Sequence, residues 1–196
     1  MRLWQLIGLT WIAIGGGAVR GDDTDAHAAY RRVAIERAAK IIGALDLSND
    51  DLQQRVHDLV AQWYITLNEI HNDRDAGRRD NEKTNERQLT AHRRFVAQLE
   101  ATLTADQVNQ VKDGLTYGVV PLTYAAYLEL LPELTDAQRR EILALLLEAR
   151  EYAMDAGSAD EKHAWFGKYK GRINNFLSAE GYDLKQAERR RGGRAR

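Results

Sequence analysis

The sequence has no cysteine, only two prolines among its 196 residues, and no long apolar run. The absence of cysteine excludes a disulfide framework, a thiolate zinc site and a cysteine nucleophile. The main apolar stretch, residues 3–14, is too short to cross a hydrocarbon core about 30 Å thick. The hydrophobic content of 44% and the net charge of −1 argue against a disordered chain, and the length suits one domain.

The first 18 residues have the order of a secretory signal peptide. A basic start, Met1-Arg2, precedes the apolar residues 3–14, and small residues follow up to Ala18. We therefore expect residues 1–18 to be removed and the mature protein to be periplasmic or secreted, without stable membrane insertion. A buried N-terminal helix is the alternative interpretation of the same segment.

The C-terminal residues 185–196 are basic, with five arginines after Glu188. We expect a disordered tail there, because short charged ends are usually frayed and solvated. Such a tail can contact a polyanion. However, the rest of the mature chain is mildly acidic, so no nucleic-acid partner is expected.

Residues 25–184 are predicted to form one all-α domain, a single irregular bundle of about six or seven helices. Apolar residues recur at helical spacing in residues 30–45, 52–70, 89–99, 108–115 and 142–153. The pattern Leu-Thr-x-x-Gln occurs at 103–107 and at 134–138, and it predicts two helix N-termini with capping boxes. Ser158 and Glu161 predict a further capping box just after Gly157. The best candidate for an extended segment is 115–121.

The primary candidate site lies on the predicted helix around residues 163–177. On a helical wheel, two polar rows flank Gly167 and Gly171, and each glycine costs a helix about 1 kcal/mol relative to alanine. The candidate ligand-binding residues are His163, Trp165, Lys168, Lys170, Arg172, Asn174 and Asn175. Cations suit carboxylates, amides suit hydroxyls and Trp165 suits stacking, so the expected ligand is an acidic saccharide. The alternative is that another helix packs on the glycines.

The secondary candidate site is a group of titratable residues near the end of the second predicted helix. Glu69 and Asp73, and likewise His71 and Asp75, are four residues apart and share a face. Such a group can bind a divalent metal or act as an acid–base pair, whereas an ion-paired, solvated helix end needs neither role. No specific metal-binding spacing is present, so neither a metal nor a cofactor is expected.

Four segments resemble one known family: residues 113–124, the helix start at 134–138, residues 148–151 and residues 153–183. They are similar to exported bacterial proteins catalogued as domain of unknown function 3826, over about residues 28–185. The resemblance implies an all-helical secreted or periplasmic protein, found often in bacteria that degrade complex polysaccharides, and it supplies no catalytic residues. The two Leu-Thr-x-x-Gln segments also resemble those of helical periplasmic stress chaperones.

Three functions are therefore open. The first is a binding or accessory protein for acidic saccharides in polysaccharide use. The second is a lyase-like enzyme on such polymers, in which His163 or Lys170 removes a proton beside a uronate carboxylate that Arg172 neutralises. The third is a periplasmic chaperone or stress protein.

Overall fold

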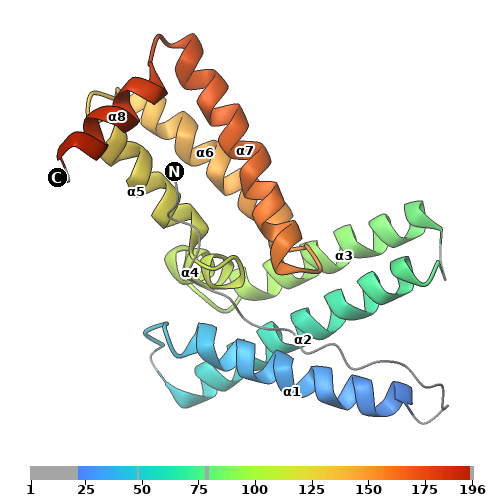
Figure 1. The fold of residues 1–196 in the computed structure, drawn as a ribbon. Coiled ribbons are helices and arrows are strands. Elements are labelled where there is room, and N and C mark those ends of the chain that lie inside the picture. The colour runs from blue at the N-terminus through green and yellow to red at the C-terminus, as the bar shows by residue number, and fades with distance from the viewer. Residues whose placement is uncertain (1–21, 48, 78–79, 195–196) are drawn as a thin grey trace.

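The computed structural model describes residues 22–47, 49–77 and 80–194. In these ranges the chain forms eight helices and no strand (Figure 1). The helices are α1 (Asp22–Ile42), α2 (Asp50–Asp75), α3 (Asn81–Glu100), α4 (Ala105–Leu115), α5 (Val119–Leu130), α6 (Asp136–Ala153), α7 (Ala159–Ala179) and α8 (Leu184–Arg194). The all-helical class is confirmed, and the described residues form eight helices rather than six or seven. The predicted signal peptide, residues 1–18, lies outside the described residues.

Side chains cap the N-termini of the described helices α2, α3, α4, α6, α7 and α8, and three of these caps illustrate the pattern. The Thr104 hydroxyl accepts from the Gln107 backbone N–H at 3.3 Å, and the Gln107 side chain accepts from the Thr104 N–H at 3.0 Å. Thr135 and Gln138 repeat this capping box at the start of α6. At the start of α2, Asn49 accepts from the N–H of the third residue after it. These bonds satisfy amides that have no partner inside the helix.

The segment 115–121, which we expected to be extended, is instead the junction of two helices. α4 ends at Leu115 and α5 begins at Val119. Tyr117 and Gly118 turn the chain between them with φ angles of 59° and 65°. Pro121 lies in the first turn of α5, where a missing N–H breaks no helical hydrogen bond.

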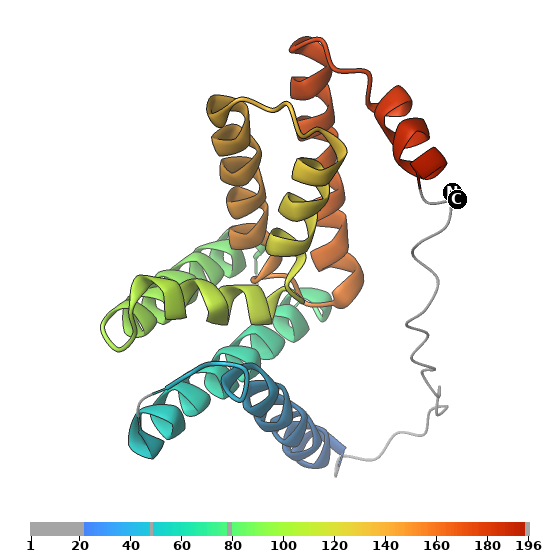
Figure 2. The ribbon, with the colours of Figure 1, turned by 90° about the vertical axis from the view of Figure 1, so that its left-hand side faces the viewer.

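The helices form two layers with separate hydrophobic clusters (Figures 1 and 2). The first layer consists of α1, α2, α3 and α4. The second layer consists of α5, α6, α7 and α8, and its helices α5–α7 stand upright on the first layer in Figure 2. Met154, at the end of α6, belongs to the cluster of the first layer and so anchors one layer in the other. Polar side chains occupy part of the boundary between the two clusters.

α8 is the helix that the sequence interpretation did not include. The expected disordered tail, 185–196, is instead helical as far as Arg194. Asp183 accepts from the Gln186 N–H at 2.9 Å and so satisfies an amide of the first turn. Leu184 and Ala187 pack against the cluster of the second layer. These two apolar contacts hold a helix whose other residues are largely charged.

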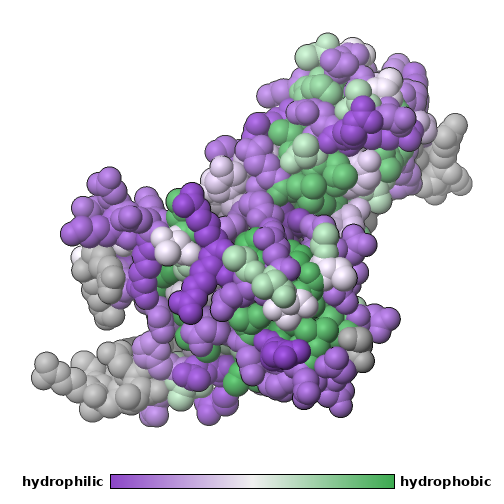
Figure 3. All heavy atoms as spheres, turned by 180° about the vertical axis from the view of Figure 1, so that it is seen from behind, coloured by the Kyte–Doolittle hydropathy of each residue, from purple (hydrophilic) through white to green (hydrophobic). Residues whose placement is uncertain are grey.

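Some hydrophobic side chains stay on the surface. Leu122 of α5 is 71% exposed. Figure 3 shows hydrophobic patches on the rear face in both halves of the molecule, bordered by hydrophilic side chains. Each helix in the described ranges is too short or too polar to cross a membrane.

Candidate functional site

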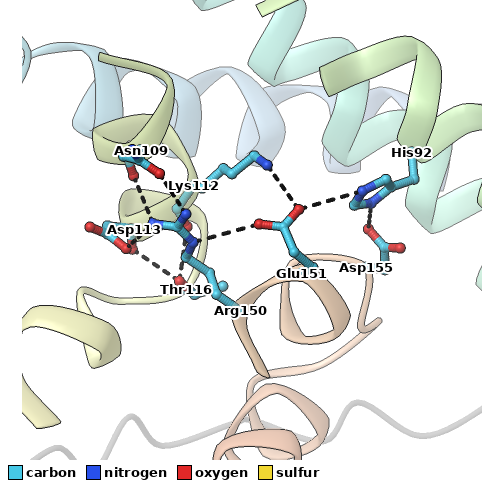
Figure 4. A network of polar contacts seen from close by, with 8 residues as sticks. All are labelled: His92, Asn109, Lys112, Asp113, Thr116, Arg150, Glu151 and Asp155. Atoms are coloured by element: carbon cyan, nitrogen blue, oxygen red, sulfur yellow. Dashed lines mark hydrogen bonds and ion pairs between the residues drawn. The ribbon is translucent and has the colours of Figure 1, made fainter. Parts of the chain in front are cut away.

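A network of polar contacts, here called the polar seam, joins α3, α4 and α6 between the layers (Figure 4). Its residues are His92, Asn109, Lys112, Asp113, Thr116, Arg150, Glu151 and Asp155. At one end, the buried guanidinium of Arg150 donates to Asp113 at 2.8 Å and to the Asn109 side chain at 2.6 Å. A buried cation is costly unless it is paired, so these two acceptors are required for α6 to pack on α4.

The other end of the polar seam connects α6 to α3. Lys112 donates to the Glu151 carboxylate at 2.8 Å, and the His92 Nε2 lies 3.6 Å from the same carboxylate oxygen. The His92 Nδ1 lies 2.8 Å from the Asp155 carboxylate. This hydrogen bond raises the pKa of His92, because it favours the protonated imidazole.

Beside the polar seam lies a cleft of about 490 Å³ between the layers, here called the inter-layer cleft. Side chains from α2, α3 and α7, together with the end of α6 and the loop after it, line this cleft. The polar and aromatic ones are His71, Arg74, Asn85, Gln88, Tyr152, Asp155, Glu161, Trp165 and Lys168. The cleft therefore combines cations, amides and aromatic rings, and it draws them from both layers.

An aromatic pair forms one wall of the inter-layer cleft. The rings of Tyr152 and Trp165 are stacked, with centroids 4.6 Å apart and planes at 17°. The Lys168 ammonium lies 4.9 Å from the Trp165 ring centroid. A flat ring next to a cation is suited to a ligand that has both an apolar face and a negative charge.

Arg74 provides a second cation in this cleft. One of its terminal nitrogens, Nη2, donates to Gln88 at 2.8 Å and to Asn85 at 3.1 Å. The other, Nη1, lies 3.4 Å from the His71 Nδ1. None of these partners is a carboxylate, so the bonds orient the guanidinium without pairing it with an anion. Gln88 also hydrogen-bonds the Asp155 carboxylate, which uses an amide N–H, whereas the bond to Arg74 uses only the oxygen of Asn85.

The glycine strip of the primary candidate site is open within the described residues. A Cβ atom built on Gly167 or Gly171 meets nothing within 4 Å. No described helix therefore lies on the strip, which was the alternative to ligand binding. The strip forms a ridge on α7, and the two polar rows beside it face different neighbours.

The structure divides the seven residues of the primary candidate site. Trp165 and Lys168 line the inter-layer cleft, whereas Arg172 donates to Glu148 of α6 at 3.2 Å. In the second row, Asn174 accepts from the Tyr127 hydroxyl at 2.7 Å.

The other members of the primary set lie along α7 outside these contacts. The His163 ring stacks on Tyr117, with centroids 5.8 Å apart. Lys170 is half-buried and Asn175 is exposed. The set therefore does not form one continuous groove.

The secondary candidate site is divided as well. Arg87 of α3 donates to Asp73 at 2.9 Å and to Glu69 at 3.4 Å. These three residues and Asp75 line a second pocket, of about 640 Å³. His71 instead faces the inter-layer cleft, where Trp165 and Lys168 of the primary set lie. Among the residues that the structure describes, no three His, Asp or Glu side chains are grouped so as to hold a metal ion.

A buried lysine that the sequence interpretation did not single out connects α7 to the first layer. The Lys162 ammonium donates to the Leu115 carbonyl at 2.8 Å and lies 5.7 Å from the ring centroids of Tyr64 and Tyr117. Burial lowers the pKa of Lys162 to about 8. The carbonyl of Leu115 belongs to the C-terminus of α4, where a cation is favourable.

The fold and the site define an all-helical protein with a mixed-charge, aromatic-lined cleft between two helical layers. The chain belongs to the family described as Protein of unknown function (DUF3826), whose model matches residues 31–88 and 78–196. The matched ranges include every residue that lines the inter-layer cleft. No curated protein matches the chain. The resemblance on which the family was predicted is thus confirmed, while export and a bacterial source remain predictions.

Proposed function

We propose that the protein is an exported binding or accessory protein for acidic saccharides, and that the saccharide occupies the inter-layer cleft. The observation that carries this proposal is the stacked pair of Tyr152 and Trp165 next to two cations, Lys168 and Arg74. Most ligand sites are clefts with apolar walls and a few polar groups that fix the ligand's orientation. The inter-layer cleft has both features.

Each part of an acidic sugar has a matching group in this cleft. The C–H face of a sugar ring is apolar and suits the aromatic wall made by Trp165 and the more exposed Tyr152. The sugar carboxylate suits Lys168 and Arg74, since charge-assisted hydrogen bonds are roughly twice as strong as neutral ones. The hydroxyls suit the amide donor of Asn85, whose oxygen alone is used by Arg74.

Two further observations support this function over its alternatives. Residues 1–18 have the pattern of an export signal, as polysaccharide binding outside the cell requires. A chaperone for unfolded proteins needs a broad apolar surface, whereas charged and amide side chains interrupt the apolar wall of the inter-layer cleft. These two points favour a saccharide as the ligand.

Isothermal titration calorimetry with a short oligogalacturonate tests the proposal, and an uncharged oligosaccharide of the same length serves as the control ligand. We expect binding of the anionic ligand only. Trp165→Ala and Lys168→Ala should each weaken it about tenfold, which corresponds to about 1.4 kcal/mol. Arg172→Ala is the matched control, because Arg172 lies on the same helix but pairs with Glu148. Equal losses in all three variants, or no binding of anionic saccharides, would refute the proposal.

A further inference from the structure

The two contacts of His71 suit one arrangement of protons on its ring. Its Nε2 lies 2.8 Å from the backbone carbonyl of Asp155, and its Nδ1 lies 3.4 Å from the guanidinium of Arg74. A carbonyl only accepts hydrogen bonds and a guanidinium only donates them. Both contacts are satisfied together when the ring is neutral, with the proton on Nε2 and a lone pair on Nδ1. In this state the imidazole is a base.

The loop between α6 and α7 holds this imidazole in place. A Cβ on Gly157 would lie 2.9 Å from the His71 Cγ, so the backbone at Gly157 lies directly against the ring. The Gly157 N–H donates to Glu161 at 2.8 Å, and Ser158 accepts from the Glu161 N–H at 3.2 Å. Glu161 thus binds the amide before the N-cap residue instead of completing the predicted capping box. The ring orientation is fixed in the way that an acid–base group requires.

The base and the nearest cation are neighbours. The Arg74 Nη1 faces the His71 Nδ1 at a distance that is long for a hydrogen bond, while Nη2 is anchored on Gln88 and Asn85. In a uronate, the carbon that carries the acidic hydrogen also carries the carboxylate. An enzyme that removes this hydrogen therefore needs its base next to a cation.

We propose that the inter-layer cleft cleaves uronate-containing polysaccharides by β-elimination, with the His71 Nδ1 as the base. This inference rests on the proposed saccharide binding. Arg74 and Lys168 pair with the uronate carboxylate and so make the hydrogen on C5 more acidic. Trp165 positions the sugar ring.

The elimination breaks the C5–H and C4–O bonds of the uronate and forms one double bond. The C5–H bond breaks, and its proton passes to the His71 Nδ1. The electron pair of that bond forms the C4=C5 double bond, while the C4–O bond breaks and its pair stays on the departing oxygen. That oxygen takes a proton from water, the imidazolium returns its proton to solvent, and no oxidant or reductant is consumed.

Hydrolysis by two carboxylates fits this cleft less well. A glycosidase of that type needs one carboxylic acid to protonate the leaving oxygen and a second carboxylate as base or nucleophile. The carboxylate of Asp155 is bound to His92 at 2.8 Å, and that of Glu161 to the Gly157 N–H at 2.8 Å. Both are therefore engaged within the protein, whereas the His71 Nδ1 has only a long contact.

The test uses the full chain with polygalacturonate, alginate and glucuronan as probes. Elimination gives an unsaturated, ultraviolet-absorbing end, and the product masses add no water. We expect His71→Gln to lower the rate about a hundredfold or more, the range for loss of a general base. Glutamine keeps a donor for the Asp155 carbonyl, so binding measured by calorimetry should change less than about threefold. His57→Gln is the matched control, because His57 also lies on α2 and its Nε2 contacts a carbonyl, that of Ile35, at 3.2 Å.

The outcomes separate the two proposals. Both saccharide binding and elimination are supported if the parent protein gives unsaturated product and His71→Gln still binds the saccharide but gives none. Binding without any product overturns the elimination and leaves the proposed function standing. Products that have gained water, or an unchanged rate in His71→Gln, also overturn this inference. If no anionic saccharide binds at all, both proposals are refuted.

Discussion

Gly157→Ala should destabilise the protein although glycine is not required there by the backbone. The described glycines with positive φ are Gly77, Gly118 and Gly181, so the φ angle of Gly157 is open to alanine. The added methyl group, however, would lie 2.9 Å from the Cγ of His71 and 3.1 Å from its Cδ2 and Nδ1. Real side chains do not approach so closely, and either the imidazole or the loop must move.

The cost follows from what holds the ring. If the imidazole moves, its 2.8 Å hydrogen bond to the Asp155 carbonyl is lost, at about 1 kcal/mol, and a half-buried acceptor is left without this partner. If the loop moves instead, the strain is that of an overpacked site, about 1–3 kcal/mol. Only one of the two movements is needed to remove the overlap. We therefore take the middle of the overpacking range and expect a loss of about 2 kcal/mol in the free energy of unfolding. For a chain of this size that lowers Tm by about 4–8 °C.

Urea unfolding followed by circular dichroism measures the effect. Gly171→Ala is the control, since its Cβ meets nothing within 4 Å and alanine should raise helix stability by up to about 1 kcal/mol. A double-mutant cycle completes the test: in a His71→Ala background, Gly157→Ala should cost almost nothing. The overlap with His71 is refuted as the cause if Gly157→Ala is as stable as the parent, or if it loses the same free energy of unfolding in the His71→Ala background. In either case the contact with His71 is not the reason for glycine at this position.

Three further predictions concern the boundary between the layers. The hydrogen bond to Asp155 raises the pKa of His92 above 6.5. The protonated imidazole therefore stabilises the folded protein fully below pH 6.5, and this contribution is lost as the pH rises through the folded-state pKa. The difference in the free energy of unfolding between the parent and His92→Gln should shrink over the same rise in pH. Burial lowers the pKa of Lys162 from 10.5 to about 8. Between these two pH values the unfolded chain binds more protons than the folded one, so the free energy of unfolding relative to Lys162→Met should rise with pH. Arg150→Met should cost about 3 kcal/mol in urea unfolding, since it leaves the Asp113 carboxylate without its cation, and a loss under 1 kcal/mol contradicts the role given to the polar seam.

Local signals in the sequence predicted most of the helices. A capping box spans only four residues, so the Thr104 and Thr135 caps needed no knowledge of the rest of the fold. α8 was missed because the arginines dominate its composition, and the burial of Leu184 depends on the second layer. In the sequence Gly157 is only the residue before a predicted capping box, whereas in the structure its closeness to His71 explains why it has no side chain.

The candidate site was predictable only in pieces. His71 and Trp165 were each singled out by spacing along one helix, but nothing local indicates that they line one cleft. The bond between His71 and the Asp155 carbonyl joins residues 84 positions apart, and that between His92 and the Asp155 carboxylate joins residues 63 positions apart. Arg74 was missed because its partners are the amides of Asn85 and Gln88 on the next helix. A carboxylate four residues away on the same helix would have shown in the sequence, but these amides do not.

Asp155 couples the cleft to the rest of the molecule. Its backbone carbonyl accepts from His71 of α2, and its carboxylate binds His92 of α3. A displacement of α3 against α6 therefore moves the residue that positions His71. His92→Gln should weaken ligand binding as well as stability. Arg150→Met, which releases α6 from α4 at the far end of the polar seam, should lower stability and leave the affinity of the folded protein largely unchanged.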